Sequence, residues 1–121
     1  VSRLENEVDL YVFERELDDK YLYPDWAAPQ YLPDMDVVVL SGTTVTNNTF
    51  DSLVSLCGQA RAVVLLGPST PLAPEVMRDK GVTLLGGTVV EEPGKAMRIL
   101  SQAGGTRGLL KASRKVNLDL Q

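Results

Sequence analysis

The chain has 121 residues with a hydrophobic content of 44%, which suits one globular domain built around a single core. Its formal net charge is −4 at pH 7 and its 12 Lys and Arg residues are scattered, so we expect no nucleic-acid partner. It has no histidine, which excludes Ser-His-Asp and Cys-His nucleophiles, and its apolar runs are far shorter than the roughly 20 residues of a membrane span.

The only cysteine, Cys57, rules out a disulfide within this sequence and fits a reducing compartment, so we expect a cytoplasmic protein. The sequence begins with Val1 rather than Met. Two interpretations are open at this point. The sequence is either a domain cut from, or processed out of, a longer chain, or a chain without its initiator Met or leader residues.

Residues 8–13, Val-Asp-Leu-Tyr-Val-Phe, are expected to form the first strand, and residues 18–23 a surface loop. A helix is then expected over residues 26–32, with Asp25 as its N-cap. Pro29 lies inside this segment and is expected to keep the helix short or distorted, because proline cannot donate a backbone hydrogen bond.

Two runs of apolar, mostly β-branched residues predict strands at 37–40 and 62–66. Such runs are typical of central strands in a parallel sheet covered by helices on each side. Between them we expect a helix that follows Asn47–Thr49 and continues to about Ala60. Its apolar side chains recur at i, i+3, i+4 and i+7, which assigns the cysteine to packing rather than to catalysis. The stripe consists of Phe50, Leu53, Val54 and Cys57.

A short helix is expected to begin at Pro74 and to stop at Gly81. A fourth strand is expected at residues 82–85, closed by the glycine pair 86–87. Residues 88–90 are either a short continuation of that strand or an extra edge strand.

The last helix is expected from Pro93 to about Ala103, and residues 109–111 and 116–118 are either a final strand or a loose tail. The alternating order of strands and helices predicts an α/β fold, with an open, mainly parallel sheet and helices on both faces. In such sheets, ligands bind beyond the carboxyl ends of the strands.

Two polar loops directly follow the second and third predicted strands. The first loop gathers uncharged hydrogen-bonding groups beside a helix N-terminus, so it could hold a carboxylate, a phosphate or a polar small molecule. In the second loop, two prolines fix the backbone around a serine and a threonine. The alternative is structural: one or two of these groups cap a helix, and the second loop is a rigid turn. The expected site residues in these loops and at the end of the fourth strand are Ser41, Gly42, Thr43, Thr44, Asn47, Asn48, Thr49, Gly67, Pro68, Ser69, Thr70 and Gly86.

The strongest charged candidate is Glu14, at the end of the first predicted strand. Its carboxylate could be a hard metal ligand, pair with a substrate amine or act as a general base. The alternative is a solvated side chain near Arg15. Neither G-x-G-x-x-G after the first strand nor a Gly-Lys-Ser/Thr motif is present, which disfavours dinucleotide and P-loop nucleotide binding.

Taken together, the segments 37–44 (VVVLSGTT), 47–49 (NNT) and 65–72 (LLGPSTPL) resemble the heavy-metal chelation family, a domain family of unknown function. The likeness extends from residues 12–15 to residues 114–116. It implies a Rossmann-like C-terminal domain of a longer two-domain protein, preceded by a smaller domain similar to the N-terminal domain of enolases. It also implies a role in binding or chelating heavy metals in the cleft between the two domains. On this resemblance, Glu14 and the loop residues named above line the cleft, and an N-terminal domain missing from this sequence completes the site.

We therefore expect residues 1–121 to form a single Rossmann-like domain that binds a heavy-metal ion, a metal complex or a small polar ligand. The alternative is an enzyme, a transferase or lyase acting on a metallophore-like or amino-acid-derived substrate, with Glu14 as the acid/base group. A third reading is a structural role in which an exposed apolar surface, including Trp26 and Tyr31, pairs with a partner chain or a second copy.

Overall fold

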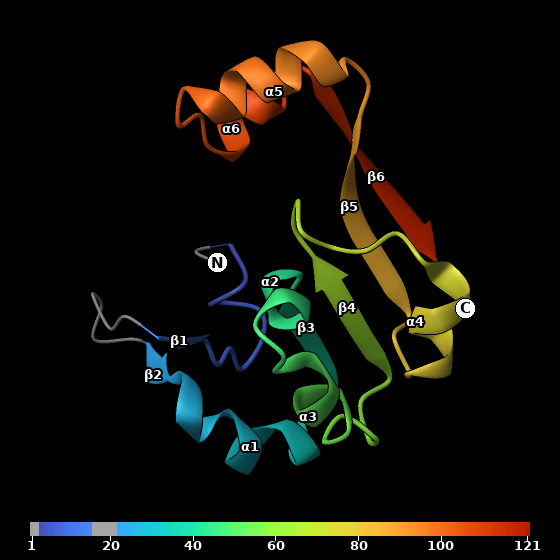
Figure 1. Cartoon of the computed structure of the whole chain (residues 1–121). Helices are drawn as coiled ribbons and strands as arrows, with labels where there is room; N and C mark the ends of the chain where they lie inside the picture. Colours follow the sequence, from blue (N-terminus) through green and yellow to red (C-terminus); the bar gives the residue numbers. More distant parts are fainter. Residues whose placement is uncertain (1–2, 16–21) are drawn as a thin grey trace.

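The computed structural model of the protein describes residues 3–15 and 22–121 and has an α/β fold (Figure 1). In this part of the chain, one sheet has the strand order β3-β4-β5-β6, and β1 and β2 form a separate two-stranded sheet. The strands are β1 (Phe13–Glu14), β2 (Tyr23–Pro24), β3 (Val37–Ser41), β4 (Ala62–Leu66), β5 (Leu84–Val90) and β6 (Ser113–Asp119). The helical segments are η1 (Asp25–Ala27), α1 (Ala28–Tyr31), η2 (Leu32–Asp34), α2 (Thr43–Thr46), α3 (Phe50–Val54), α4 (Pro74–Asp79), α5 (Pro93–Ser101) and α6 (Thr106–Leu109).

The main sheet is mostly parallel, which confirms the predicted fold class. β3, β4 and β5 run parallel, and β6 returns antiparallel to β5. Of the two C-terminal segments expected as a strand or a loose tail, residues 116–118 lie in β6, whereas Leu109 ends α6 and residues 110–111 form a turn. β6 pairs with β5 along its whole length, from Leu84 opposite Asp119 to Val90 opposite Ser113.

The hydrophobic core lies on one face of the main sheet. Val38 pairs with Val63 and, two residues further along each strand, Leu40 pairs with Leu65. All four side chains are buried. Leu65 and its neighbour on β5, Leu85, are completely buried. Burying a Leu side chain stabilises a fold by about 1.5–3 kcal/mol, so these strands anchor the domain. The residues from outside the strands that complete the core are Ala28, Leu32, Phe50, Cys57, Met77, Val82 and Leu120.

Cys57 is a core residue, as the apolar stripe predicts. Its side chain is only 4% exposed, and its Sγ donates a hydrogen bond to the carbonyl oxygen of Leu53 at 3.3 Å. Burial raises the pKa of the Cys57 thiol, because the surrounding core disfavours the charged thiolate. The assignment of this residue to packing rather than to catalysis is confirmed.

The helix carrying this stripe is shorter than predicted, because α3 ends at Val54 rather than near Ala60. The hydroxyls of Ser52 and Ser55 each donate to a carbonyl three residues earlier at 2.8 Å. Such bonds offer the backbone an alternative to a regular helix. The chain after α3 therefore continues in tight turns that still bring the cysteine to the core.

The opposite face of β3 carries exposed apolar side chains. Val37 is 46% and Val39 60% exposed, and Leu66 at the end of β4 is 39% exposed. These residues alternate along their strands with the buried core residues. The sequence predicts helices on both faces, and the described residues leave this part of the second face open.

The predicted first strand is largely wrong. Only Phe13 and Glu14 of this region are in a strand, and that strand pairs with β2 outside the main sheet. A strand requires a hydrogen-bonded partner, and pairing begins only where the amide of Tyr23 donates to the carbonyl of Val12 at 2.8 Å. Most of the loop predicted at 18–23 lies outside the described residues.

Four aromatic rings hold β1, β2 and α1 together. Tyr11, Phe13, Tyr23 and Tyr31 have ring centroids 5.3–5.7 Å apart in tilted pairs. Tilted arrangements at this separation are favourable for aromatic side chains. This aromatic cluster explains why the N-terminal segment is a small unit of its own beside the main sheet (Figure 1).

The segment after β2 is helical but broken, as predicted from its prolines. η1, α1 and η2 follow one another, and Pro29 and Pro33 each occupy the first turn of their segment. The predicted cap is wrong, however. Asp25 is the first helical residue, and Pro24 takes the N-cap position without a side-chain hydrogen bond.

The glycine pair 86–87 does not close the fourth strand, which is a further correction. β5 runs from Leu84 through both glycines to Val90, so residues 88–90 are its continuation. A β-carbon at Gly86 would lie 2.4 Å from Leu66 Cδ2, and one at Gly87 would lie 2.7 Å from Leu72 Cδ2. The glycines therefore lie inside the strand, beside the side chains of Leu66 and Leu72, and do not form a turn.

α4 and α5 follow the prediction, whereas α6 (Thr106–Leu109) was not expected. α4 begins at Pro74, and Gly81 follows it with a φ of +91°, a conformation that favours glycine as a helix stop. α5 begins at Pro93 and ends at Ser101, close to the predicted Ala103. Among the helices of the described residues, none has the length and apolar character needed to cross a membrane.

Candidate functional site

The two polar loops begin side by side, at the carboxyl ends of β3 and β4. Ser41 and Leu66, the last residues of these strands, are paired in the sheet. The amide of Gly42 donates to the carbonyl oxygen of Leu66 at 2.6 Å, and the amide of Gly67 donates to that of Gly86 at 3.0 Å. Three neighbouring strands are thus tied together where the loops leave the sheet.

The loops also pack directly against each other. A β-carbon at Gly42 would lie 2.5 Å from the backbone nitrogen of Thr70, 2.7 Å from its Oγ1 and 2.8 Å from the carbonyl carbon of Ser69. Only glycine allows two backbones to approach this closely. The residues Ser41–Thr44 and Gly67–Thr70 therefore form one continuous surface, which we call the loop rim.

Thr70 lies at the centre of the contact between the loops. It is 6% exposed, and its Oγ1 is buried without a hydrogen-bond partner among the described residues. A buried hydroxyl that makes no hydrogen bond costs about 1–3 kcal/mol. The loop rim thus contains a polar group whose hydrogen-bonding capacity is unused by its protein neighbours.

The first loop is shorter than predicted, because the helix α2 already begins at Thr43. Its residues are ordered by bonds among their own side chains. The Ser41 and Thr43 hydroxyls are 2.8 Å apart, the Thr43 amide donates to Ser41 Oγ at 3.3 Å, and Thr44 Oγ1 donates to the Ser41 carbonyl at 2.7 Å. Ser41 and Thr43 are nevertheless exposed. Local capping, the structural alternative, therefore accounts for part of this polar cluster while leaving oxygen atoms at the surface.

The following residues form a second, separate turn. Asn47 Oδ1 accepts bonds from the amide of Thr49 at 3.2 Å and from its hydroxyl at 2.6 Å. Asn48 has a φ of +61°, in the left-handed region that Asn tolerates better than most residues. This turn leads into α3, and its hydrogen bonds are of the kind that shape a turn.

The second loop owes its direction to Gly67. This residue has a φ of +120°, which side chains rarely allow, and the amide of Thr70 donates to its carbonyl at 3.0 Å. Pro68 and Ser69 at the tip of this turn are exposed. They form the outer part of the loop rim.

Glu14 lies outside the main sheet. It lies in β1, in the separate two-stranded sheet, and is exposed. Within the described residues, no group of three or more His, Cys, Asp and Glu side chains is close enough to hold a metal ion.

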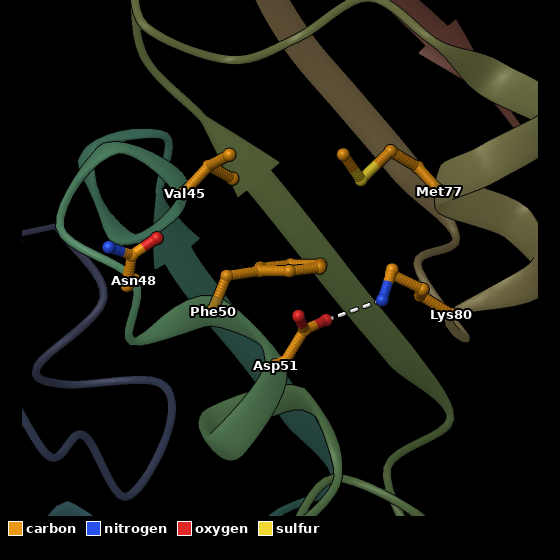
Figure 2. A pocket seen from close by; sticks show the side chains of 6 residues that line it. All are labelled: Val45, Asn48, Phe50, Asp51, Met77 and Lys80. Carbon is orange, nitrogen blue, oxygen red and sulfur yellow. Dashed lines mark hydrogen bonds and ion pairs between the residues drawn. The ribbon is translucent and has the colours of Figure 1, made fainter.

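A cavity of about 260 Å³ lies elsewhere, between α2, α3 and α4 (Figure 2). Phe50 and Met77 point toward each other across β4, and the ammonium of Lys80 forms an ion pair with Asp51 at 2.5 Å. Both charged side chains are largely exposed, so the pair contributes little to stability. Sequence reasoning missed this cavity, because α3 and α4 meet only in the folded chain. Its lining residues are Val45, Asn48, Phe50, Asp51, Met77 and Lys80, of which Asn48 alone is an expected site residue.

Comparison with known proteins decides the family. The family model described as "Putative heavy-metal chelation" matches residues 1–119. The chain belongs to this family. An uncharacterized protein of Methanocaldococcus jannaschii is 31% identical to it, over 93% of this chain and 44% of that protein.

Two solved structures of family members with unknown function have the same fold. The protein from Pyrococcus horikoshii matches with a TM-score of 0.89 and 28% identity, over 98% of this chain and 50% of its own. The protein from Desulfitobacterium hafniense matches with a TM-score of 0.87 and 33% identity, over 98% of this chain and 47% of its own. The chain thus spans about half the length of the relatives that it matches.

Proposed function

We propose that the loop rim binds a small polar ligand or a metal complex and forms one wall of a cleft. The observation that carries this proposal is the contact of Gly42 with Thr70, since it brings two loops rich in hydroxyls and amides to one edge of the sheet. Open α/β sheets bind ligands at this edge. The unmatched half of the relatives' length is available to supply the opposite wall.

The chemistry of the rim favours an oxygen-rich ligand over a bare metal ion. Its exposed polar residues include Ser41, Thr43 and Ser69, whose hydroxyls can donate hydrogen bonds to carboxylates and other anions. Heavy metals prefer imidazole and thiolate ligands, and the chain has no histidine and only one buried cysteine. A metal held by an organic carboxylate ligand fits both this rim and the description of the family.

Binding is the preferred activity over catalysis. The enzyme alternative needs Glu14 as an acid/base group at the rim, and this residue belongs to β1 in the separate sheet. The rim itself offers hydrogen-bond donors and acceptors. Binding a ligand through these groups requires no proton transfer.

The test is equilibrium dialysis of the chain against Ni²⁺ alone and against the Ni²⁺–citrate complex, with the metal measured by mass spectrometry. We expect retention of the complex and not of the bare ion. Removing exposed rim hydroxyls, in Thr43→Val and Ser69→Ala, is expected to weaken retention at least tenfold, about 1.4 kcal/mol.

Ser101→Ala is the matched control, because its exposed hydroxyl bonds to the Arg98 carbonyl on α5, outside the rim. Equal retention by the two rim variants and the unchanged chain would contradict the assignment of the site. Retention of Ni²⁺ alone, undiminished by the rim variants, would contradict the ligand class as well.

A further inference from the structure

The cavity between α2, α3 and α4 has an apolar base and a charged opening (Figure 2). Phe50 and Met77 form the base, since they are only 5% and 6% exposed, and Val45 is half-buried beside them. Asp51 and Lys80 lie at the opening, where both side chains are largely exposed. Small-molecule sites are usually concave and mainly apolar, with a few polar groups that orient the ligand. None of these residues belongs to the loop rim, so the cavity is a separate candidate site.

Hydrogen bonds of the backbone fix both sides of the cavity. On one side, the amide of Lys80 donates to the carbonyl oxygen of Met77 at 3.2 Å, in the last turn of α4. On the other side, the amide of Thr49 donates to the carbonyl oxygen of Thr44 at 2.9 Å and closes the turn that contains Asn48. A site that is formed before binding loses less conformational entropy when a ligand enters. The cavity is therefore preorganised.

The volume of the cavity, about 260 Å³, restricts the ligand to a small molecule. An apolar protein cavity of about 150 Å³ can hold benzene. The cavity between the helices therefore accommodates a benzene-sized group together with a short polar end. The ring of Phe50 and the thioether of Met77 both make favourable contacts with apolar and aromatic groups. The apolar part of the ligand thus has the size of a leucine, methionine or phenylalanine side chain.

The ion pair at the opening determines which polar end the ligand carries. The Lys80 ammonium and the Asp51 carboxylate lie 2.5 Å apart, so both charges are present at one place. A ligand carboxylate alone would pair with Lys80 and face the like charge of Asp51, and a ligand ammonium alone would face the like charge of Lys80. A ligand that carries both charges replaces one ion pair by two. Because an exposed ion pair contributes little to stability, opening it costs little.

We propose that this cavity binds an α-amino acid with an apolar side chain. The side chain of the ligand lies against Phe50 and Met77. Its carboxylate pairs with the ammonium of Lys80, and its ammonium pairs with the carboxylate of Asp51. This second site is independent of the ligand proposed for the loop rim.

The test is a titration of the isotope-labelled chain with L-phenylalanine, in the absence of metal, followed by NMR of the backbone amides. We expect shifts at residues 45–51 and 77–81, with a Kd of roughly 1 mM or lower. Two analogues remove one charge each: 3-phenylpropionate lacks the ammonium and phenethylamine lacks the carboxylate. Glycine retains both charges and lacks the apolar side chain. Each of these three molecules should bind at least tenfold more weakly than phenylalanine.

Two variants should reverse the preference between the single-charge analogues. Lys80→Gln leaves Asp51 without its cation, so phenethylamine should bind this variant more tightly than the unchanged chain, and 3-phenylpropionate more weakly. Asp51→Asn should have the opposite effect. Both variants should weaken the binding of phenylalanine at least tenfold. Lys95→Gln is the matched control and should leave the Kd unchanged, because it breaks an exposed ion pair with Glu92, at 3.2 Å, outside the cavity.

Three results would overturn the proposal. Equal binding of phenylalanine and the two single-charge analogues would show that the ion pair does not select the ligand. Shifts confined to the amides of the loop rim would show that the amino acid binds there and not in the cavity. Unchanged amide signals at about ten times the expected Kd would show that the cavity takes no amino acid. Because neither Ni²⁺ nor citrate is added, none of these results decides whether the rim binds Ni²⁺–citrate.

Discussion

The backbone nitrogen of Thr70 occupies the space that a side chain at Gly42 would need, 2.5 Å from where its β-carbon would lie. Gly42 has a φ of −56°, which any residue can adopt, so space and not backbone freedom requires the glycine. The contact joins the ends of two parallel strands whose loops are unrelated in sequence. Because Gly42 has no side chain, the two loops of the candidate site can pack directly against each other.

Gly42→Ala is expected to destabilise the protein by about 1–3 kcal/mol, because its β-carbon would displace backbone atoms of the second loop. Urea unfolding followed by circular dichroism measures the change. Gly58→Ala is the control, since nothing lies within 4 Å of a β-carbon there, and it should change stability by less than about 0.5 kcal/mol. Similar effects of the two substitutions would contradict the close packing of the loops.

Thr70→Val is expected to stabilise the unliganded protein by about 1 kcal/mol, because it replaces a buried, unpartnered hydroxyl with a methyl group of similar size. Thr83→Val provides the opposite case. The Thr83 hydroxyl donates to the Val63 carbonyl and accepts from the Val63 amide, both at 3.1 Å, so its removal should cost about 1 kcal/mol. Thermal unfolding of both variants tests the contrast, and destabilisation by Thr70→Val would mean that its hydroxyl has a partner.

Gly86→Ala is expected to destabilise the protein by no more than about 1 kcal/mol, because the new methyl group would meet Leu66 Cδ2, the end of a flexible side chain that can change its rotamer. Leu66→Ala removes that obstacle from a side chain that is already 39% exposed. The double variant should therefore be more stable than the sum of the two single effects predicts, by up to about 1 kcal/mol in a double-mutant cycle. Additive effects would show that the glycine is required for another reason.

Cys57 should make the stability of the protein depend on alkaline pH. Burial raises the pKa of its thiol in the folded protein above its ordinary value of 9.0, so folding favours the protonated form. The stabilisation is complete below the unfolded pKa and is lost as pH rises through the folded pKa. Above pH 9, the free energy of unfolding of the natural protein should fall more steeply than that of Cys57→Ala, by up to about 1.4 kcal/mol per pH unit. Parallel pH profiles for the two proteins would contradict this.

Leu85→Ala should cost about 2–5 kcal/mol, since this side chain is completely buried between the core helices and the sheet. Val39→Ala, on the face of β3 opposite the core and 60% exposed, should cost less than about 1 kcal/mol. Urea unfolding again measures both. A large loss for Val39→Ala would show that this face of β3 is covered in this chain.

The sequence was informative where the determinants of structure are local. The strand at 62–66 was predicted with its observed bounds, and α4 and α5 with their first residues, because short apolar runs and helix-starting prolines act within a few positions. The convergence of the two loops followed from the same reasoning. Parallel strands end on one edge of a sheet, so their loops meet there.

The errors arose where the decisive partner is distant in sequence. The glycine pair at 86 and 87 suggests a turn, yet both residues lie inside β5, and the side chains of Leu66 and Leu72 occupy the space beside them. Residues 8–13 were predicted as a strand from their apolar pattern, which does not reveal the pairing partner. In the structure, β1 pairs with β2 and not with the main sheet. The cavity between α3 and α4 could not be found either, because a short helix pattern does not specify which helix lies opposite.

Val90 and Ser113, which bound the segment containing α5 and α6, are directly paired in the sheet. The amides of Glu91 and Glu92 both donate to the carbonyl of Ala112 at 3.0 Å, which closes the base of that segment. The polypeptide thus leaves the sheet after Val90 and rejoins it at Ser113, the residue directly opposite in the ladder. We therefore expect that residues 91–112 can be lengthened, shortened or replaced by a tight hairpin while the pairs between β5 and β6 stay intact.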